Sequence, residues 1–238
     1  MMVTSFLKKR NWSARSIIED IARSGWTNVG VDSSLKEFFM ADLCSEYDSI
    51  NLYNLLYSRR QEFSPYFVQY LDFWYADEKN HADGFFELSR LVFGMSELSL
   101  LQALQSRTAD FSGMHDILSD EFRLLLMFAY DEYISVKTYK KDTFYEGLGH
   151  PGFRYWIKNL IADEAVHFGN AIKLLRRDHS GRMHECEAVL NMISNFEGES
   201  YKNTFLFDHD GPHFSLSGEE VGQVIVQDIL QILHKGSV

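Results

Sequence analysis

A four-residue pattern, Glu-x-x-His, occurs twice in this chain, at 78–81 and again 86 residues later at 164–167. A solitary glutamate precedes each copy by 32 residues, Glu46 in the first half and Glu132 in the second. Residues i and i+3 of an α-helix share a face, so the Glu and His of each copy can hold one ion together. Single matches arise easily by chance, but a shared spacing of all six residues does not. The pattern therefore predicts a helical protein with one duplicated site.

Other identities follow the same offset and extend the duplication beyond the six residues. They are Asp77 and Asp163, Tyr47 and Tyr133, Ser49 and Ser135, Tyr53 and Tyr139, and Pro65 and Pro151. A repeat of this length describes two related helical hairpins.

Each hairpin must reverse halfway between its solitary glutamate and its Glu-x-x-His pair if these are to lie at the same level. At the first midpoint stand Ser64 and Pro65, a good N-cap and a residue suited to the first helical position. At the second midpoint, Gly147 to Pro151 supply a helix stop and a new start. We therefore expect the four glutamates to meet at one depth.

The helix signals predict an all-α, single-domain chain over residues 1–238. Core helices are expected over 32–60, 65–93, 116–146 and 151–178, after an amphipathic helix over 13–24. The connection over 95–116 contains a short helix at 96–105. Accessory C-terminal helices are expected within 182–236, at 183–196 and 217–234, around an irregular loop at 197–216. His209 and His213 in that loop are assigned to a surface turn rather than to a metal site.

Composition narrows the class of protein. A hydrophobic content of 45% with three prolines suits one large helical core. The formal charge of −11 disfavours nucleic acid as a partner. The chain has no apolar run of membrane-spanning length, and the apolar stretch within residues 1–10 is too short for a signal peptide. The two cysteines form no C-x-x-C pair, which excludes a rubredoxin-like iron site and suits a reduced, cytoplasmic location.

Four carboxylates in a helical core are costly unless something neutralises them. Buried ion pairs are the alternative to a metal, but they do not explain why histidine, rather than Lys or Arg, recurs at i+3. Oxygen and imidazole donors without thiolate suit iron or manganese better than structural zinc. The predicted metal ligands are Glu46, Glu78, His81, Glu132, Glu164 and His167.

The stretches Asp77-Glu78-Lys79-Asn80-His81 and Asp163-Glu164-Ala165-Val166-His167 resemble the D/E-E-x-x-H motifs of the ferritin-like di-iron carboxylate superfamily. The first is especially similar to the motif of soluble acyl-carrier desaturases. The resemblance covers about residues 32–178 and implies a ferritin-like four-helix bundle with accessory N- and C-terminal helices. It implies two Fe ions, with an Fe/Mn pair as an option. Glu46, Glu78 and His81 would serve one ion, Glu132, Glu164 and His167 the other, and Glu78 and Glu164 would bridge.

The resemblance also implies roles around the ligands. Asp77 and Asp163 would each accept the free N–H of a ligand histidine from the opposite hairpin, the alternative being ordinary surface acids. Ser135 lies where desaturase-like oxygenases often carry a hydroxyl for proton delivery, although the repeat alone could account for it.

Further candidates lie one turn from the ligands or beside them. Asp42 is either an extra carboxylate at the site or solvated, and Tyr47 and Tyr133 are interpreted as structural rather than redox-active. A hydrophobic pocket, with core packing as the alternative reading, is expected from Leu43, Trp74, Phe85, Phe128, Ala129, Leu160 and Ala171.

These features predict an O2-dependent non-haem di-iron oxidase or oxygenase that acts on a small, largely apolar organic molecule. Hydroxylation, desaturation, N-oxygenation and C–C cleavage all suit the ligand set. The sequence has no flavin, nicotinamide or iron–sulfur motif, so electrons would come from an external donor or from the substrate. The alternatives are a ferritin-like iron-oxidising storage protein and a ribonucleotide-reductase-like radical generator. A homodimer is compatible with each.

Overall fold

Helices make up most of the computed structural model, which describes residues 6–197, 216–218 and 220–235 and contains no strand within them. The all-α prediction is therefore confirmed for this part of the chain. The helices are α1 (Ala14–Arg23), α2 (Leu35–Ser58), α3 (Pro65–Phe93), α4 (Glu97–Gln105), α5 (Glu121–Lys141), α6 (Phe144–Gly147), α7 (Pro151–Asp178), α8 (Cys186–Ser194) and α9 (Ile225–His234).

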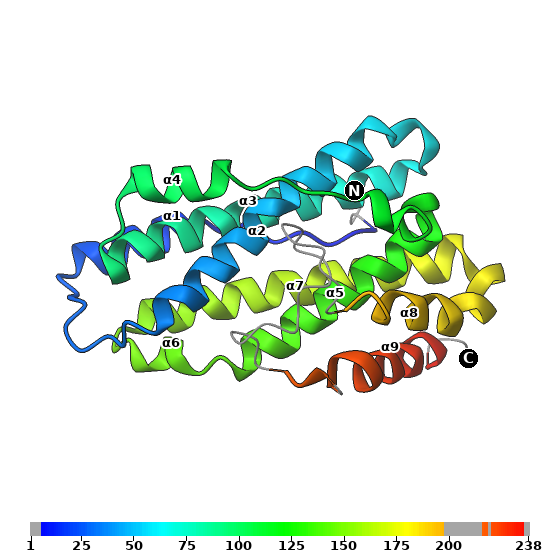
Figure 1. Cartoon of the computed structure of the whole chain (residues 1–238). Helices are drawn as coiled ribbons and strands as arrows, with labels where there is room; N and C mark the ends of the chain where they lie inside the picture. Colours follow the sequence, from blue (N-terminus) through cyan, green and yellow to red (C-terminus); the bar gives the residue numbers. More distant parts are fainter. Residues whose placement is uncertain (1–5, 198–215, 219, 236–238) are drawn as a thin grey trace, which may run out of the picture.

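Two antiparallel pairs of long helices form the centre of the molecule (Figure 1). α2 packs along α3, α5 packs along α7, and α3 also contacts α7. α1 lies against α3 and α7, whereas α8 and α9 pack against α5. The contact between α3 and α7 brings the two Glu-x-x-His helices next to each other.

Local caps produce the predicted reversals of the chain. The Ser64 side chain accepts a hydrogen bond from Phe67 N, and Pro65 occupies the first position of α3. In the second pair, Gly149 has a φ of 73° and His150 caps α7 through its bond from Gly152 N. Both turns are confirmed, because the residues that make them act within a few positions of the chain.

The third core helix differs from the prediction of 116–146. α5 begins at Glu121, because Asp120 adopts an extended conformation and caps Arg123 N. It ends at Lys141, and after a break at Asp142 the short helix α6 carries Tyr145 into the core. The Tyr145 ring lies 5.5 Å from both Phe39 and Trp156. Packing of this ring accompanies the break.

The C-terminal region also differs in detail. α8 begins at Cys186, three residues later than expected, after a 3-10 segment over Ser180–Glu185. A capping box opens the last helical segment, because Ser217 N donates to Glu220 Oε2 (2.9 Å) and Glu220 N donates to Ser217 Oγ (3.2 Å). A π-helical turn, Glu220–Val224, then leads into α9. His209, His213 and most of the expected loop lie outside the described residues.

A polar layer divides the hydrophobic core into two clusters. Along α3, the buried hydrophobic side chains from Phe67 to Trp74 belong to one cluster and those from Phe85 to Val92 belong to the other. Between them lie Asp77, Glu78 and His81, which are also buried. Ionisable groups are costly in such a position unless they are compensated, so this layer is where a functional site is expected.

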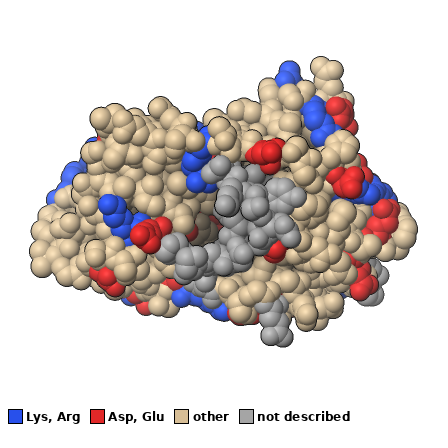
Figure 2. Space-filling view, viewed as in Figure 1, with Lys and Arg blue, Asp and Glu red and all other residues tan. Residues whose placement is uncertain are grey.

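The surface adds two findings. None of the described helices is both long and apolar enough to traverse a lipid bilayer. On the face shown in Figure 2, the described acidic and basic residues are interspersed rather than gathered into a basic stripe.

Candidate metal centre

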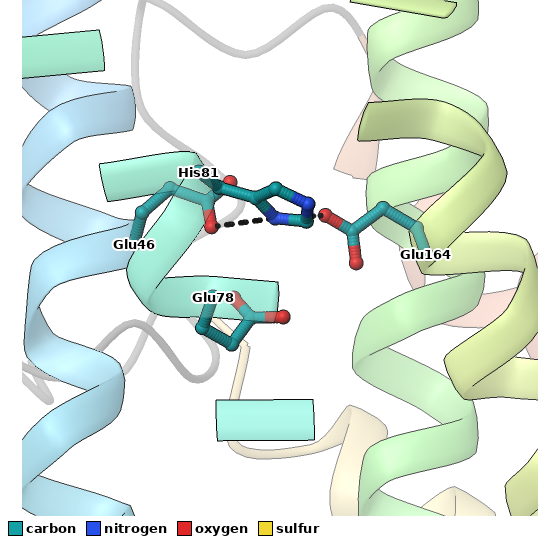
Figure 3. A group of neighbouring side chains, drawn as sticks. All are labelled: Glu46, Glu78, His81 and Glu164. Atoms are coloured by element: carbon teal, nitrogen blue, oxygen red, sulfur yellow. Dashed lines mark ion pairs between the residues drawn. The ribbon is translucent and has the colours of Figure 1, made fainter. Parts of the chain in front are cut away.

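The six predicted ligands meet in the polar layer between the two apolar clusters. They form two groups that could each hold a metal ion, one of Glu46, Glu78, His81 and Glu164, the other of Glu78, Glu132, Glu164 and His167. Within each group the ligand atoms lie within 4.8 Å of one another. Figure 3 shows the first group converging from α2, α3 and α7. Two glutamates, one from each Glu-x-x-His helix, belong to both groups.

Both histidines point Nδ1 toward the carboxylates. His81 Nδ1 lies 3.3 Å from Glu46 Oε2 and 3.3 Å from Glu164 Oε1. His167 Nδ1 lies 3.2 Å from Glu132 Oε2 and 3.3 Å from Glu164 Oε2. Glu164 therefore presents one oxygen to each half of the site.

An aspartate stands behind each histidine. His81 Nε2 lies 3.2 Å from Asp163 Oδ2, and His167 Nε2 lies 3.2 Å from Asp77 Oδ2. Each pair joins α3 to α7. A carboxylate at one ring nitrogen holds the ring and its tautomer, so that the other nitrogen can accept a metal ion. The role of the two aspartates toward a metal stays a prediction.

Unsatisfied buried atoms give an independent test of fit for a cation. Glu46 Oε2, Glu78 Oε1 and His81 Nδ1 are buried and make no hydrogen bond, although each lies 3.3–3.4 Å from an oppositely charged group when the histidines are protonated. Leaving such an atom unsatisfied costs about 1–3 kcal/mol, and more when it is charged. All three belong to the first ligand group. Because they are carboxylate oxygens and an imidazole nitrogen, they fit a divalent iron or manganese ion.

The pKa directions show how strongly these groups are coupled. Burial, reinforced by repulsion from Glu164, raises the pKa of Glu78 well above its usual range, and burial also raises the pKa of Glu132. Burial opposes ionisation of Glu164, but hydrogen bonds and nearby histidine charge lower its pKa overall. Burial would lower the pKa of His81 and His167, yet the surrounding carboxylates raise both well above their usual value. The cluster thus holds protons that a bound cation would displace.

Tyr139 is a site residue that the sequence analysis did not single out. Its hydroxyl donates a 2.7 Å hydrogen bond to Glu46 Oε1 inside the core. Burial and the nearby Glu46 raise its pKa well above the usual value, so the hydroxyl keeps its proton. The sequence offered one indication of Tyr139, its repeat of Tyr53 at the 86-residue offset. Tyr53 itself does not reach the predicted ligands, because its hydroxyl donates to Asp72 (3.0 Å) near the surface.

The N-terminal segment contributes contacts that no motif indicated. Arg10 Nη1 lies 3.0 Å from Asp163 Oδ1, and Trp12 Nε1 donates to Asp163 Oδ2 at 2.5 Å. Lys9 Nζ lies 3.5 Å from Asp77 Oδ1. These contacts reach both aspartates behind the histidines.

Several other candidates contact something other than the ligands. The Ser135 hydroxyl donates to the Asp131 carbonyl of its own helix (3.2 Å), so its predicted role in proton delivery has no support from a contact with a ligand. The Tyr133 hydroxyl donates to Asp228 of α9 (3.0 Å). Tyr47 is half-buried against the apolar cluster that contains Phe85 and Trp156. Asp42 is half-buried and lies close enough to Tyr139 to raise its pKa.

The predicted pocket residues are all buried and lie on both sides of the ligands. One cluster contains Trp74, Phe128, Ala129 and Ala171, and the other contains Leu43, Phe85 and Leu160. The Trp74 and Phe128 rings pack edge to face at 4.9 Å. These side chains give the site apolar walls, and a substrate pocket among them stays a prediction.

Comparison with known proteins gives no relative: no family model, curated protein or solved structure matches the chain.

Proposed function

We propose that this chain is a ferritin-like di-iron protein in which α2, α3, α5 and α7 form a four-helix bundle around two metal ions. The observation that carries the proposal is that the two ligand groups share Glu78 and Glu164. Shared carboxylates suit two ions held side by side, with one histidine for each. Iron is the proposed metal, and an Fe/Mn pair would suit the same ligands.

The proposed activity is O2-dependent oxidation or oxygenation of a small, largely apolar organic molecule. A bound iron pair would supply the binding and activation of O2. Asp77 and Asp163 would hold the ligand rings, while Tyr139 would hold Glu46 and keep a proton at its hydroxyl. The buried aromatic residues on both sides of the ligands exclude water and favour an apolar substrate. Electrons would come from an external donor or from the substrate.

A ribonucleotide-reductase-like radical generator is the second candidate, and the contact of Tyr139 with Glu46 favours it. A radical on Tyr139 would require the loss of one electron to the oxidant that a bound iron pair and O2 would supply, with the phenolic proton passing to Glu46 over 2.7 Å. Electron paramagnetic resonance after exposure of the Fe(II) protein to O2 distinguishes the candidates. A stable tyrosyl signal that is absent from Tyr139→Phe would favour the radical generator.

Metal analysis of purified variants tests the site. We expect about two iron ions per chain in the parent protein. Glu164→Ala and His81→Ala should each lose iron, because Glu164 contacts both histidines and His81 is a ligand of the first group. Tyr133→Phe should keep it, since the Tyr133 hydroxyl bonds to Asp228. Full iron occupancy in Glu164→Ala would refute the assignment of the ligands.

Oxygen uptake tests the activity. The anaerobic Fe(II) protein is mixed with O2 in the presence or absence of fatty acids, aldehydes and amines, and O2 consumption is recorded with an electrode. Faster uptake with one substrate class, together with an oxidised product by mass spectrometry, supports an oxygenase. A protein that binds iron but consumes no O2 under any condition would refute it, and a closed multi-subunit shell by native mass measurement would favour the storage protein.

A further inference from the structure

The residues before α1 form a strap that crosses α3 and α7 beside the metal centre. This strap, residues 6–13, has no helix and appears as the blue segment leading into α1 in Figure 1. Lys8 exchanges two hydrogen bonds with the Asn170 side chain of α7, at 3.0 and 2.7 Å. Where the strap meets α1, Ala14 N donates to Asn80 of α3 (2.9 Å). The strap is therefore fixed to both Glu-x-x-His helices.

Within the strap, two side chains hold Asp163 from both of its oxygens. Arg10 Nη1 lies 3.0 Å from Oδ1, and Trp12 Nε1 donates to Oδ2 at 2.5 Å. The same Oδ2 lies 3.2 Å from His81 Nε2. Arg10 is held in turn by the Asn159 carbonyl (2.6 Å) and amide oxygen (2.7 Å). Hydrogen bonds thus run from the strap to a ligand histidine.

The other half of the site receives less support. Lys9 Nζ lies 3.5 Å from Asp77 Oδ1, an ion pair at longer distance. The Asp77 side chain is 9% exposed, whereas that of Asp163 is fully buried. The two halves are related by the sequence repeat, but the strap crosses the molecule only once. Its contacts with Asp77 and with Asp163 therefore differ.

Charge gives a second reason for the strap to be part of the site. The four glutamates and two aspartates would carry six negative charges when ionised. Two divalent ions, as the proposed function requires, would offset four of them. Lys9 and Arg10 supply the remaining two positive charges at the aspartates.

We propose that the strap is a component of the metal centre. Arg10 and Trp12 act as positioning residues that hold Asp163, and through it the orientation of His81. The ion bound by Glu46 and His81 depends on the strap more strongly than the ion bound by Glu132 and His167. The two metal positions consequently differ in affinity although their ligands are repeated.

Titration of the metal-free protein with Co(II) tests this proposal, which rests on the proposed dinuclear site. Binding is followed by visible absorption, and the exchangeable ring N–H protons of the two histidines by paramagnetically shifted NMR signals. In the double variant Arg10→Gln/Trp12→Phe, we expect one of the two Co(II) equivalents to bind about ten-fold more weakly. The N–H signal of His81 should exchange faster, while that of His167 stays unchanged.

Matched variants separate positioning from general charge or folding effects. Arg15→Gln removes the same charge from an exposed arginine of α1 that pairs with Glu87, and should leave both equivalents unchanged. Arg10→Lys should recover part of the affinity lost in Arg10→Gln. Trp12→Phe alone, which keeps an aromatic ring at this position, provides the comparison if the double variant does not fold.

The outcomes are distinct. Two equivalents that keep parental affinity, or that weaken equally with no selective change at His81, would overturn the proposal. A parent protein that binds two Co(II) ions but, loaded with iron, consumes no O2 would refute the oxygenase and leave the role of the strap intact. A parent that binds no Co(II) would refute both.

Discussion

Replacement of Gly84 by alanine should destabilise the protein at the point where three helices meet. A Cβ at Gly84 would lie 2.6 Å from Trp156 Nε1 and 2.9 Å from Ala14 Cβ, closer than real Cβ contacts allow. Trp156 is fully buried and packs against Phe85 at a ring distance of 4.7 Å, so it has little room to shift. The added methyl group must therefore push α3 away from α1 and α7.

The magnitude follows from two opposing effects. Alanine is favoured over glycine inside a helix by about 0.8–1 kcal/mol, and overpacking of a core costs about 1–3 kcal/mol. Gly169 of α7 offers a matched control, since nothing lies within 4 Å of its added Cβ. Gly169→Ala should gain the helix term alone, so Gly84→Ala should be less stable than this control by about 1–3 kcal/mol.

Thermal and urea unfolding of the two variants measure this difference. For a chain of this size, 2 kcal/mol corresponds to about 4–8 °C in Tm. The substitution should also weaken Co(II) binding, because the spacing of α3 and α7 sets the contact of 3.2 Å between His81 and Asp163. If Gly84→Ala proved as stable as Gly169→Ala, the close approach of these helices would be refuted.

Two further variants test electrostatics. Burial would raise the pKa of Glu121, but hydrogen bonds from His179 and from the start of α3 lower this pKa below its ordinary value of 4.5. The ionised carboxylate therefore stabilises the fold above pH 4.5, and this stabilisation is lost as the pH falls through the folded-state pKa. In urea unfolding at pH 7, we expect the free energy of unfolding of Glu121→Gln to be about 1–2 kcal/mol below that of the parent protein. This difference should disappear in acid, and a difference that does not change with pH would contradict the stabilising role of the Glu121 carboxylate. Tyr139→Phe removes the donor to Glu46 and should weaken Co(II) binding by roughly 2–10-fold, whereas Tyr133→Phe should not. Equal Co(II) affinities in these two variants would show that the Tyr139 hydroxyl does not support Glu46 as a metal ligand.

The helix boundaries show which parts of the fold could be predicted from the sequence. Ser64 with Pro65, and Gly149 with Pro151, act through backbone groups a few residues away, so their turns could be predicted. The break after α5 could not, because it accompanies the packing of Tyr145 against residues more than ten positions distant. Local chemistry is visible in a sequence, and packing partners are not.

The sequence by itself determined the all-α class and the six residues that meet in the polar layer, since helical spacing and the repeat describe both. Only the tertiary structure decided how the two halves differ. Tyr53 and Tyr139 share a repeat position, yet one lies near the surface and the other bonds to Glu46. Arg10 and Trp12 reach Asp163 across more than 150 residues of chain, with no periodicity to link them. A repeat predicts equal halves, and the single N-terminal strap makes them unequal.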